Sequence, residues 1–564
     1  MSDEFIYEFN KEGASEKKFI MQEKHYVFKQ DNSGGGGSGA YPGNQVVFEL
    51  ENFTSPDCFD SYAESFIAMP LKLAMEAVGG SFAPAINGEG LAVGNDFALC
   101  LKNGIHNLID NCKIEIDGVV ANNAVPMSNL EMGWRLHKMG LDEMNNYQDV
   151  MNYALDTADS IRNYGNVPTE YGLGEVNNVI KESLFDPAKG YYNETNMVNK
   201  GRQERMKVTS NNPDSNDFVK YYISSRKTLE NHWISGVSRK TATVIEYDIF
   251  AIIPLPIIHT LFASLPLARG VKLRITLNMN TGCSATFAFS NPAGADDIKG
   301  KYLSYSTVTP NITLPFQISP IQGGFYPGKA LGALATLELT NSVLKTCRFY
   351  ACRYKLAPEY ERDYIKSPLK LVTYNDFIIR PLPNVKGGEP VQFTVNTSTQ
   401  KLRYLLIIPQ LSSQINSTST TTFGSVYSSP FSSAPGTCCV GGKIQNLQVS
   451  VGGKNIYNNV GNYSFEHYLE QLRPELSING GSLNSHGLCS GNISKTMWEK
   501  GYGYYFVDLS RHSDVSMDNV PKDVTVYFIN NSDKNIDYQF LLANEKNFTL
   551  HCSTGEIVNG ELRM

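Results

Sequence analysis

IEIDGVVANNAVPMSNLEMGW, residues 114–134, has a counterpart in the second half of the same chain, VSVGGKNIYNNVGNYSFEHYL, residues 449–469. Each copy reads as an alternating strand that ends in a Gly turn, followed by a polar stretch and an amphipathic segment. In an ungapped alignment Gly118 falls on Gly453 and Glu131 falls on Glu466. The pattern indicates two related β units in tandem, because an internal repeat constrains a fold strongly.

A second pair of segments follows in the same order. YDIFAIIP, from Tyr247, leads to VKLRITLN, which begins at Val271. YYFVDLS, from Tyr504, leads over a similar interval to VTVYFIN, which begins at Val524. Chance similarity between alternating strands is the alternative explanation, and two landmarks in register argue against it.

The bulk composition agrees with a large β-rich protein. A chain of 564 residues exceeds what one hydrophobic core normally serves. The 31 Tyr and 28 Phe suit pleated, half-buried surfaces. Short strand-like runs are separated by turns and long loops, which is typical of jelly rolls. The sequence therefore predicts an all-β protein with inserted helices, built from two tandem eight-stranded jelly-roll β-sandwiches.

Domain boundaries follow from shifts in composition. Residues 1–40 are charged and then Gly-rich, which predicts an N-terminal arm with a hinge. Residues 41–356 are predicted to form the first jelly roll, and residues 357–564, which open with a charged connector, the second. The interval from Glu131 to Tyr247 is far longer than that between their counterparts, Glu466 and Tyr504, so the first unit carries a large insertion. We place this loop insertion at about residues 137–235.

Charge and cysteine content exclude several classes of protein. The net charge is −7 and no dense Lys/Arg cluster is present, which argues against sequence-specific nucleic-acid binding. The ten cysteines form no CxxC pair, and the N-terminus lacks the pattern of a signal peptide. We therefore expect synthesis in a reducing, intracellular compartment without secretion, and free thiols.

One apolar stretch resembles a membrane span without being one. IFAIIPLPIIHTLFASLPLA, residues 249–268, is long enough, but Pro254, Pro256 and Pro266 would each break a helix, and His259 lies within it. A buried strand followed by a short core helix explains the stretch better, so we predict no transmembrane segment.

Candidate catalytic and ligand-binding motifs fail on their details. A Walker-like string at residues 323–330 ends in Ala330, where a phosphate loop needs Ser or Thr for Mg²⁺. The nine His contain no His-x-His pair of the cupin type. We expect His259 and His467 to be core histidines. The sequence thus assigns no catalytic, cofactor-binding or metal-ligating residue, and no cofactor.

The polar run VDLSRHSD also has a structural explanation. Asp508, Ser510, Arg511 and His512 crowd together in it. Neighbours in a strand point to opposite faces, which works against a shared catalytic site. We expect hydrogen bonds of a turn at the end of a strand instead.

With these landmarks in order, the chain resembles the double jelly-roll major capsid proteins of virophages and polinton-like viruses, in the adenovirus hexon lineage of double-stranded DNA viruses. The resemblance rests on IQNLQVSVGGKNIYNN, YSFEHYLEQL, GYGYYFVDLSRHSDV and DVTVYFINN, and on IIHTLFASLPLARGVKLRITLN in the first half. It implies a virion protein that is not an enzyme: a homotrimeric, pseudo-hexagonal capsomer that tiles an icosahedral shell around double-stranded DNA. Its partners would be copies of itself, neighbouring trimers, and penton and minor capsid proteins.

Two other functions remain open at this stage. A carbohydrate-binding or glycan-processing β-sandwich would need a cleft with stacked aromatic side chains. A minor capsid protein would need one roll, whereas this chain has two. The capsid interpretation also predicts that residues 1–40 form a mobile arm that becomes ordered on neighbouring subunits, so that deleting residues 1–32 would cost only about 1–2 kcal/mol.

Overall fold

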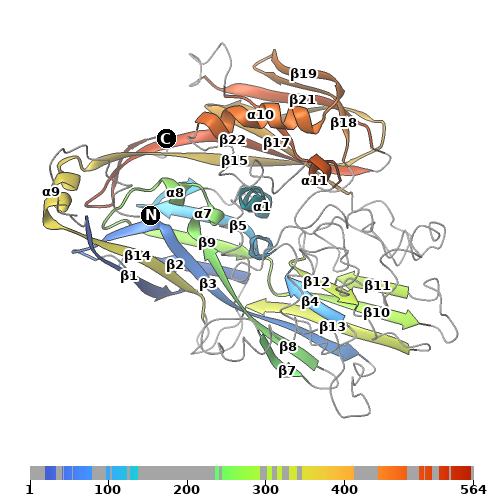
Figure 1. Cartoon of the computed structure of the whole chain (residues 1–564), viewed down its shortest axis with the longest axis horizontal. Helices are drawn as coiled ribbons and strands as arrows, with labels where there is room; N and C mark the ends of the chain where they lie inside the picture. The colour runs from blue at the N-terminus through green and yellow to red at the C-terminus, as the bar shows by residue number, and fades with distance from the viewer. Residues whose placement is uncertain are drawn as a thin grey trace.

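Two β-sandwiches lie one above the other in the view of Figure 1, with short helices between and beside them. The computed structural model describes residues 20–32, 41, 44–51, 53, 55–78, 97–101, 104–122, 127–137, 236–240, 244–291, 302–307, 314–320, 329–339, 346–411, 442–478, 495–500, 502–510, 520–532 and 535–560. All strand pairs in it are antiparallel.

The second sandwich is a complete jelly roll of two four-stranded sheets. One sheet has the order β15-β22-β17-β20 and the other has the order β16-β21-β18-β19. A short strand, β23, adds to β22. The bounds are β15 Leu369–Val385, β16 Pro390–Thr399, β17 Leu402–Leu411, β18 Ile444–Val451, β19 Lys454–Asn462, β20 Tyr505–Asp508, β21 Lys522–Asn530, β22 Ile536–His551 and β23 Ile557–Gly560.

The first sandwich repeats this topology. Its sheets have the orders β1-β14-β3-β8 and β2-β9-β5-β6. In both rolls the strands of one sheet are the first, eighth, third and sixth along the roll, and those of the other are the second, seventh, fourth and fifth. The bounds are β1 Met21–Gln30, β2 Gln45–Glu49, β3 Phe59–Val78, β5 Ile109–Ile116, β6 Val119–Asn122, β8 Val244–Pro254, β9 Leu273–Met279 and β14 Arg348–Leu356. The predicted pair of eight-stranded jelly rolls is confirmed.

The repeat seen in the sequence is structural. The alignment that places Gly118 on Gly453 superposes β5 on β18 from end to end, and the two strands have the same alternation of buried and half-buried positions. Each ends in a tight turn with two residues at positive φ, Asp117 and Gly118 in the first roll and Gly452 and Gly453 in the second. Such turns match the twist of the strands they join. The segments from Tyr247 and Tyr504 likewise run through equivalent strands, β8 and β20.

The N-terminal segment is a correction to the sequence prediction. Residues 21–30 do not belong to a free arm, because β1 pairs with β14 from Met21↔Leu356 to Gln30↔Arg348. They form the first strand of the first roll, equivalent to β15 in the second. Only residues 1–19 and 33–40 of the expected arm, the latter including the Gly-rich segment, lie outside the described residues.

The long strands of the first roll continue into a further sheet region. Beyond the roll, the second half of β3 pairs with β13, which pairs with β10, and β10 pairs with β11. Two smaller pairs, β7 with β8 and β12 with β4, lie on the same side of the molecule (Figure 1). The bounds are β4 Phe97–Leu101, β7 Gly236–Lys240, β10 Cys283–Asn291, β11 Tyr302–Thr307, β12 Phe316–Pro320 and β13 Lys329–Leu339. The predicted insertion at about 137–235 falls almost wholly outside the described residues.

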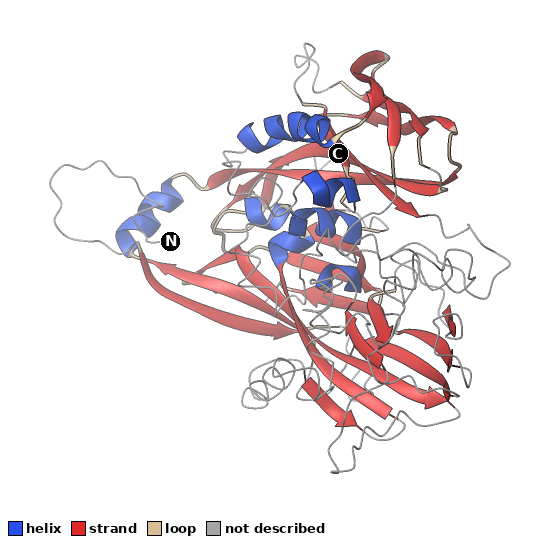
Figure 2. Cartoon of the chain, turned by 45° about the vertical axis from the view of Figure 1, so that its right-hand side comes forward, coloured by secondary structure: helices blue, strands red, loops and turns tan. Residues whose placement is uncertain are grey.

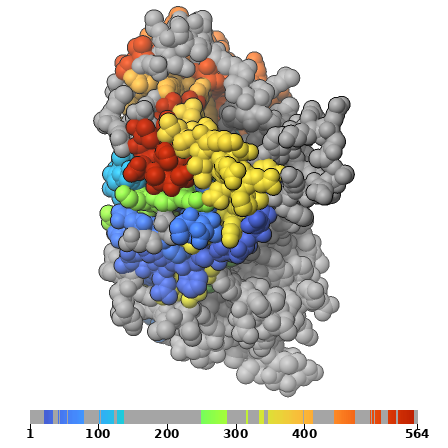
Figure 3. Space-filling view, turned by 90° about the vertical axis from the view of Figure 1, so that its left-hand side faces the viewer, coloured from blue at the N-terminus to red at the C-terminus, as the bar shows by residue number. Residues whose placement is uncertain are grey.

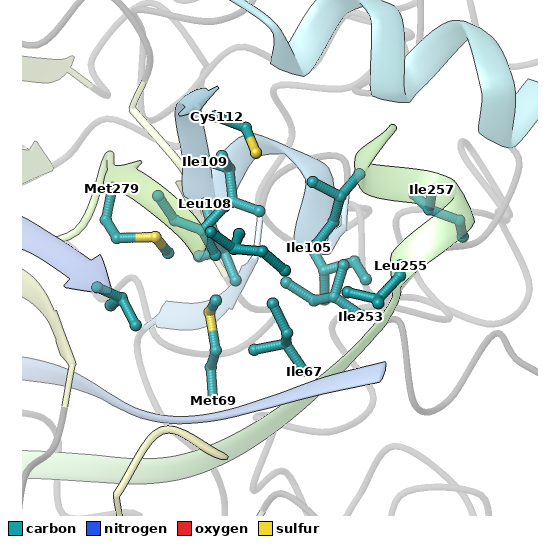
Figure 4. Packing of buried hydrophobic residues seen from close by; sticks show 14 of the residues in the cluster. Ile67, Met69, Ile105, Leu108, Ile109, Cys112, Ile253, Leu255, Ile257 and Met279 are labelled. Carbon is teal, nitrogen blue, oxygen red and sulfur yellow. The ribbon is translucent and has the colours of Figure 1, made fainter. Parts of the chain in front are cut away.

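Alternation along the strands builds one core in each roll. In Figure 4, Ile67 and Met69 of β3 point toward Leu108 and Ile109, where the chain enters strand β5 of the facing sheet, and all four are fully buried. Burying a side chain of this size contributes about 1.5–3 kcal/mol. The second core lies between the sheets that contain β17 and β18.

Short helices fill the space between and beside the rolls (Figure 2). Their bounds are η3 Ile105–Leu108, α1 Asn129–His137, α7 Leu255–Ile258, α8 Leu261–Ser264, α9 Pro358–Lys366, α10 Phe465–Ile478 and α11 Lys495–Lys500. The apolar stretch 249–268 is the buried strand β8 followed by α7 and α8, as predicted. Within the described ranges no helix has the length and apolar character needed to cross a membrane.

The charged connector after the first roll is helix α9. It begins with Pro358 and has Glu359 and Glu361 in its first turn and Lys366 in its last. Proline fits the first turn of a helix, and these charges complement the helix dipole. Figure 3 shows this yellow segment at the surface between the blue strands of the first roll and the red C-terminal strands of the second.

Candidate functional site: the junction between the two rolls

The junction is where the two rolls contact each other within the chain. From the first roll it receives α1, the turn through α7 and α8, and β6. From the second roll it receives the long strands β15 and β22 and the outer face of the sheet β15-β22-β17-β20. In Figure 1 the helices α1, α7 and α8 lie between the two sandwiches.

Helix α1 joins the two cores. Its Met132 and Leu136 belong to the first core, whereas Leu130 and Trp134 belong to the second. The members of each pair are one helical turn apart, so the two pairs lie on two sides of the helix. Glu131 in the first turn complements the helix dipole. A helix of the first roll thus supplies part of the hydrophobic core of the second.

Trp134 is the largest side chain at the junction and is 1% exposed. Its ring centroid lies 5.5 Å from that of Tyr504 in an edge-to-face arrangement and 6.1 Å from that of Phe506 in a stacked one. The cluster continues across the sheet, because the ring of Tyr404 lies 4.8 Å from that of Phe506 and 6.0 Å from that of Phe377. Such geometries stabilise aromatic pairs beyond their buried area.

Arg135 fixes α1 to the turn that follows β8. Its Nε donates to the carbonyl oxygen of Ile257 at 2.9 Å, its guanidinium also contacts the carbonyl of Ile258, and it pairs with Glu131 one turn earlier. The last carbonyls of a short helix have no partner within it, so these bonds satisfy them. Burial lowers the pKa of Arg135 to about 9, which leaves the side chain charged at neutral pH.

A buried polar cluster lies beside these groups. The Nδ1 atom of His259 accepts a hydrogen bond from the backbone N–H of Leu261 at 3.1 Å. Its Nε2 lies 3.8 Å from Oδ1 of Asp376, longer than a hydrogen bond, and Asp376 also pairs with Lys546. Burial lowers the pKa of His259. Burial would raise the pKa of Asp376, but His259 and Lys546 together hold it below its ordinary value.

Direct backbone contacts complete the junction. The hydroxyl groups of Tyr374 and Thr260 donate across it to carbonyl oxygens, those of Ala121 and Asn375, both at 2.7 Å. Gly555 lies so close to the first roll that a Cβ on it would sit 2.3 Å from the backbone nitrogen of Val271. With the shared aromatic core, these contacts fix the two rolls at one angle. The arrangement offers mechanical rigidity rather than a reactive group.

The remaining candidate motifs have structural roles or are not described. Asp508 Oδ1 accepts hydrogen bonds from the backbone N–H of Ser510 at 2.9 Å and from its hydroxyl at 2.6 Å, as expected for a turn. Arg511, His512 and the Walker-like string at 323–328 lie outside the described residues. Among the residues described, no His, Cys, Asp and Glu side chains gather in a way that could hold a metal ion.

The two histidines singled out from the sequence differ in burial. His259 is fully buried at the junction, as predicted. His467 is only half-buried, so its assignment to a core is wrong. Its Nδ1 accepts from the backbone N–H of Ser464 at 3.1 Å, which caps the start of α10. Six of the cysteines within the described residues are free and buried: Cys58, Cys112, Cys283, Cys347, Cys352 and Cys552.

Comparison with known proteins gives a match in structure and none in sequence. No family model and no curated protein matches the chain. A chain of the cryo-EM structure of the Sputnik virophage aligns with a TM-score of 0.52 at 11% identity, covering 98% of this chain and 91% of that one. The mavirus major capsid protein aligns with a TM-score of 0.45 at 10% identity, covering 99% and 94%.

The Sputnik virophage alignment covers both rolls, the junction and the strands beyond the first roll, so the similarity is one of whole-chain architecture. At this identity it is evidence about fold. The resemblance noted from the sequence is therefore confirmed at that level: the chain shares its double jelly-roll fold with a chain of the Sputnik virophage structure.

Proposed function

We propose that the chain is a major capsid protein that forms a homotrimer of pseudo-hexagonal outline and tiles an icosahedral shell around a double-stranded DNA genome. Its place is the virion, its partners are neighbouring trimers and penton and minor capsid proteins, and its role is structural rather than enzymatic. The observation that carries the proposal is a double jelly-roll fold shared over 98% of the chain with a virophage structure.

The geometry of the junction supports this role. Two similar rolls held at a fixed angle give six similar units in a trimer, and a head-to-tail contact between similar units closes into a ring when the rotation allows it. Within the proposal the chain divides near residue 357 into two domains. The insertion at about 137–235 would supply outer loops of the capsomer.

Two measurements test the proposal. Light scattering of the purified chain should give three times the chain mass of 62.5 kDa, and negative-stain images should show particles with a six-sided outline. A stable monomer or dimer under conditions that permit assembly would contradict it. A glycan-binding β-sandwich, the competing function, would instead retain a glycan on an array and remain monomeric.

A further inference from the structure

Helix α10 occupies in the second roll the position that α1 occupies in the first. Both helices follow the turn-linked strand pair of their roll, and the alignment that superposes β5 on β18 also superposes them. In that alignment Leu130 of α1 corresponds to Phe465 of α10, and Trp134 corresponds to Leu469. The two residues that α1 inserts into the neighbouring roll thus have apolar counterparts on α10.

The counterparts are not buried as Leu130 and Trp134 are. Trp134 is 1% exposed because it lies on the second roll, whereas Leu469 is 37% exposed. Phe465 is half-buried, and Tyr468 and Leu472, on the inner side of α10, belong to the second core. At the positions where α1 contacts the next roll, α10 therefore presents Leu469 and part of Phe465 to solvent.

The surface that α1 covers also has an exposed equivalent. In the second roll, Trp134 lies on the outer face of the sheet β15-β22-β17-β20, formed there by Phe377, Tyr404 and Phe506. The equivalent sheet of the first roll is β1-β14-β3-β8. Its outer face, opposite the core residues Ile67 and Ile253, is also rich in aromatic side chains.

We call this outer face of the first roll the aromatic face and define it by Tyr26, Phe28, Phe66, Ile252 and Tyr350. The rings of Phe66 and Tyr350 stack at 4.8 Å, and Tyr26 and Phe28 extend the cluster at 5.7 Å from Phe66 and Tyr350, respectively. Tyr26 and Phe28 are 46% and 49% exposed. Phe66 and Ile252 are half-buried and Tyr350 is buried, so Tyr26 and Phe28 supply most of the exposed apolar surface of this face. Neighbouring exposed aromatic side chains are characteristic of an interaction surface.

We propose that α10 of one copy docks on the aromatic face of a second copy, with Leu469 in the place that Trp134 takes within the chain. The inference rests on the proposed trimer and names its contact. Repeating the junction from the second roll of one copy to the first roll of the next brings these two exposed surfaces together. Three such contacts, alternating with three junctions, close a ring of six rolls.

Charge distribution agrees with this pairing. Glu466, which pairs with Lys495, and Glu470 flank Leu469 on the exposed side of α10. At the rim of the aromatic face, Arg348 lies over the ring of Phe28 at 4.8 Å, and Lys24, which pairs with Glu64 at 2.8 Å, lies near the ring of Tyr26 at 6.0 Å. Opposite charge at the rim of an interface steers association and fixes its register. Two aromatic faces would instead bring like charges together, which disfavours a symmetric dimer through this surface.

The first test is the charge substitution Leu469→Glu, measured by light scattering over a dilution series. Placing a carboxylate in the centre of a desolvated contact should raise the dissociation constant of the assembly on the order of 100-fold. Val558→Glu is the matched control, because Val558 is 38% exposed but lies on β23, which belongs to neither surface, and it should leave assembly unchanged. Equal assembly of both variants would overturn the proposal.

The second test keeps the surface close to native and detects the contact directly. The double variant Leu469→Cys with Phe28→Cys, treated with a short bis-maleimide, should give covalent dimers and trimers on a denaturing gel, whereas each single variant should not. A trimeric protein without this cross-link would refute the docking surface and leave the proposed function standing. A protein that never forms a trimer would refute both, and a cross-linked species that stops at the dimer would refute the ring.

Discussion

Trp134 should couple the unfolding of the two rolls, and its removal gives a direct measure of that coupling. Replacing a fully buried Trp by Ala typically costs about 3–5 kcal/mol, because the transfer free energy of the ring is lost and a cavity remains. Here the edge-to-face contact with Tyr504 and the stacked contact with Phe506 are lost as well, each worth about 0.5–1.5 kcal/mol. We therefore expect Trp134→Ala to lower the free energy of unfolding by about 5 kcal/mol, near the upper end of that range.

The assay is urea unfolding followed by tryptophan fluorescence and circular dichroism at one protein concentration. Because Trp134 sits on a helix of the first roll and in the core of the second, Trp134→Ala should also split a single transition into two. The control Trp134→Phe keeps a ring on Phe506 and should cost about 1–2 kcal/mol without splitting the transition.

The result that would refute this reasoning is specific. If Trp134→Ala lost less than about 1 kcal/mol, or if both probes still gave one coincident transition, Trp134 would not be joining the two cores. The fixed angle between the rolls would then have to depend on the other contacts of the junction, which include the polar and backbone contacts and the buried side chains of β15 and β22 that belong to the first core.

Three further predictions concern the junction and the N-terminal strand. Gly555→Ala should lower the free energy of unfolding by more than about 2 kcal/mol, as measured from urea midpoints. Gly388→Ala, which is also at positive φ but has open space at its Cβ position, should lower it by about 1 kcal/mol. Because the pKa of His259 is lowered in the folded chain, the unfolded chain binds more protons, so the free energy of unfolding should fall as the pH drops below about 6.5. The variant His259→Asn keeps an acceptor for the backbone N–H and should make that fall shallower. An unchanged dependence of stability on pH would contradict this. Deleting residues 1–32 removes β1 and should lower the free energy of unfolding by well over the roughly 1–2 kcal/mol expected of a free arm, with aggregation through the exposed edge of the sheet. Deleting residues 1–19 keeps β1 and is the control. Equal melting temperatures of the two deletions would argue against the strand.

The repeat made most of the fold predictable from the sequence. A tight turn with residues of positive φ tolerates few side chains, so Gly118 and Gly453 preserve the register of the two copies although most other positions differ. Alternation in β5 and β18 then assigns the same faces to the core. The helix after each strand pair follows from the same alignment.

Strand β1 could not be recognised in this way. Its outward face carries Tyr26 and Phe28, whereas His25 and Lys29 occupy alternate positions on the inner side. Alternation therefore suggests that the aromatic residues are buried and the polar ones exposed, which is the reverse of the structure. Its partner, β14, is the last strand of the first roll, so no local signal indicates the pairing. Aromatic residues in a charged N-terminal segment instead suggested a free arm.

The junction was also missed, although the aligned residues contain its signal. Trp134 and Leu469 occupy the same position of the repeated unit. Their difference in size reflects whether the surface around each residue is covered during folding or only on assembly. The contact made by Trp134 forms as the chain folds, so a large aromatic side chain there never faces water in the native state. If the α10 surface is covered only on assembly, its protomer must first remain soluble with that surface exposed. A smaller Leu469 flanked by Glu466 and Glu470 meets both needs, because it limits the apolar area shown to solvent and still provides a centre for the contact. The divergence between the two copies is thus what a repeated interface requires when one instance is permanent and the other forms between separate chains.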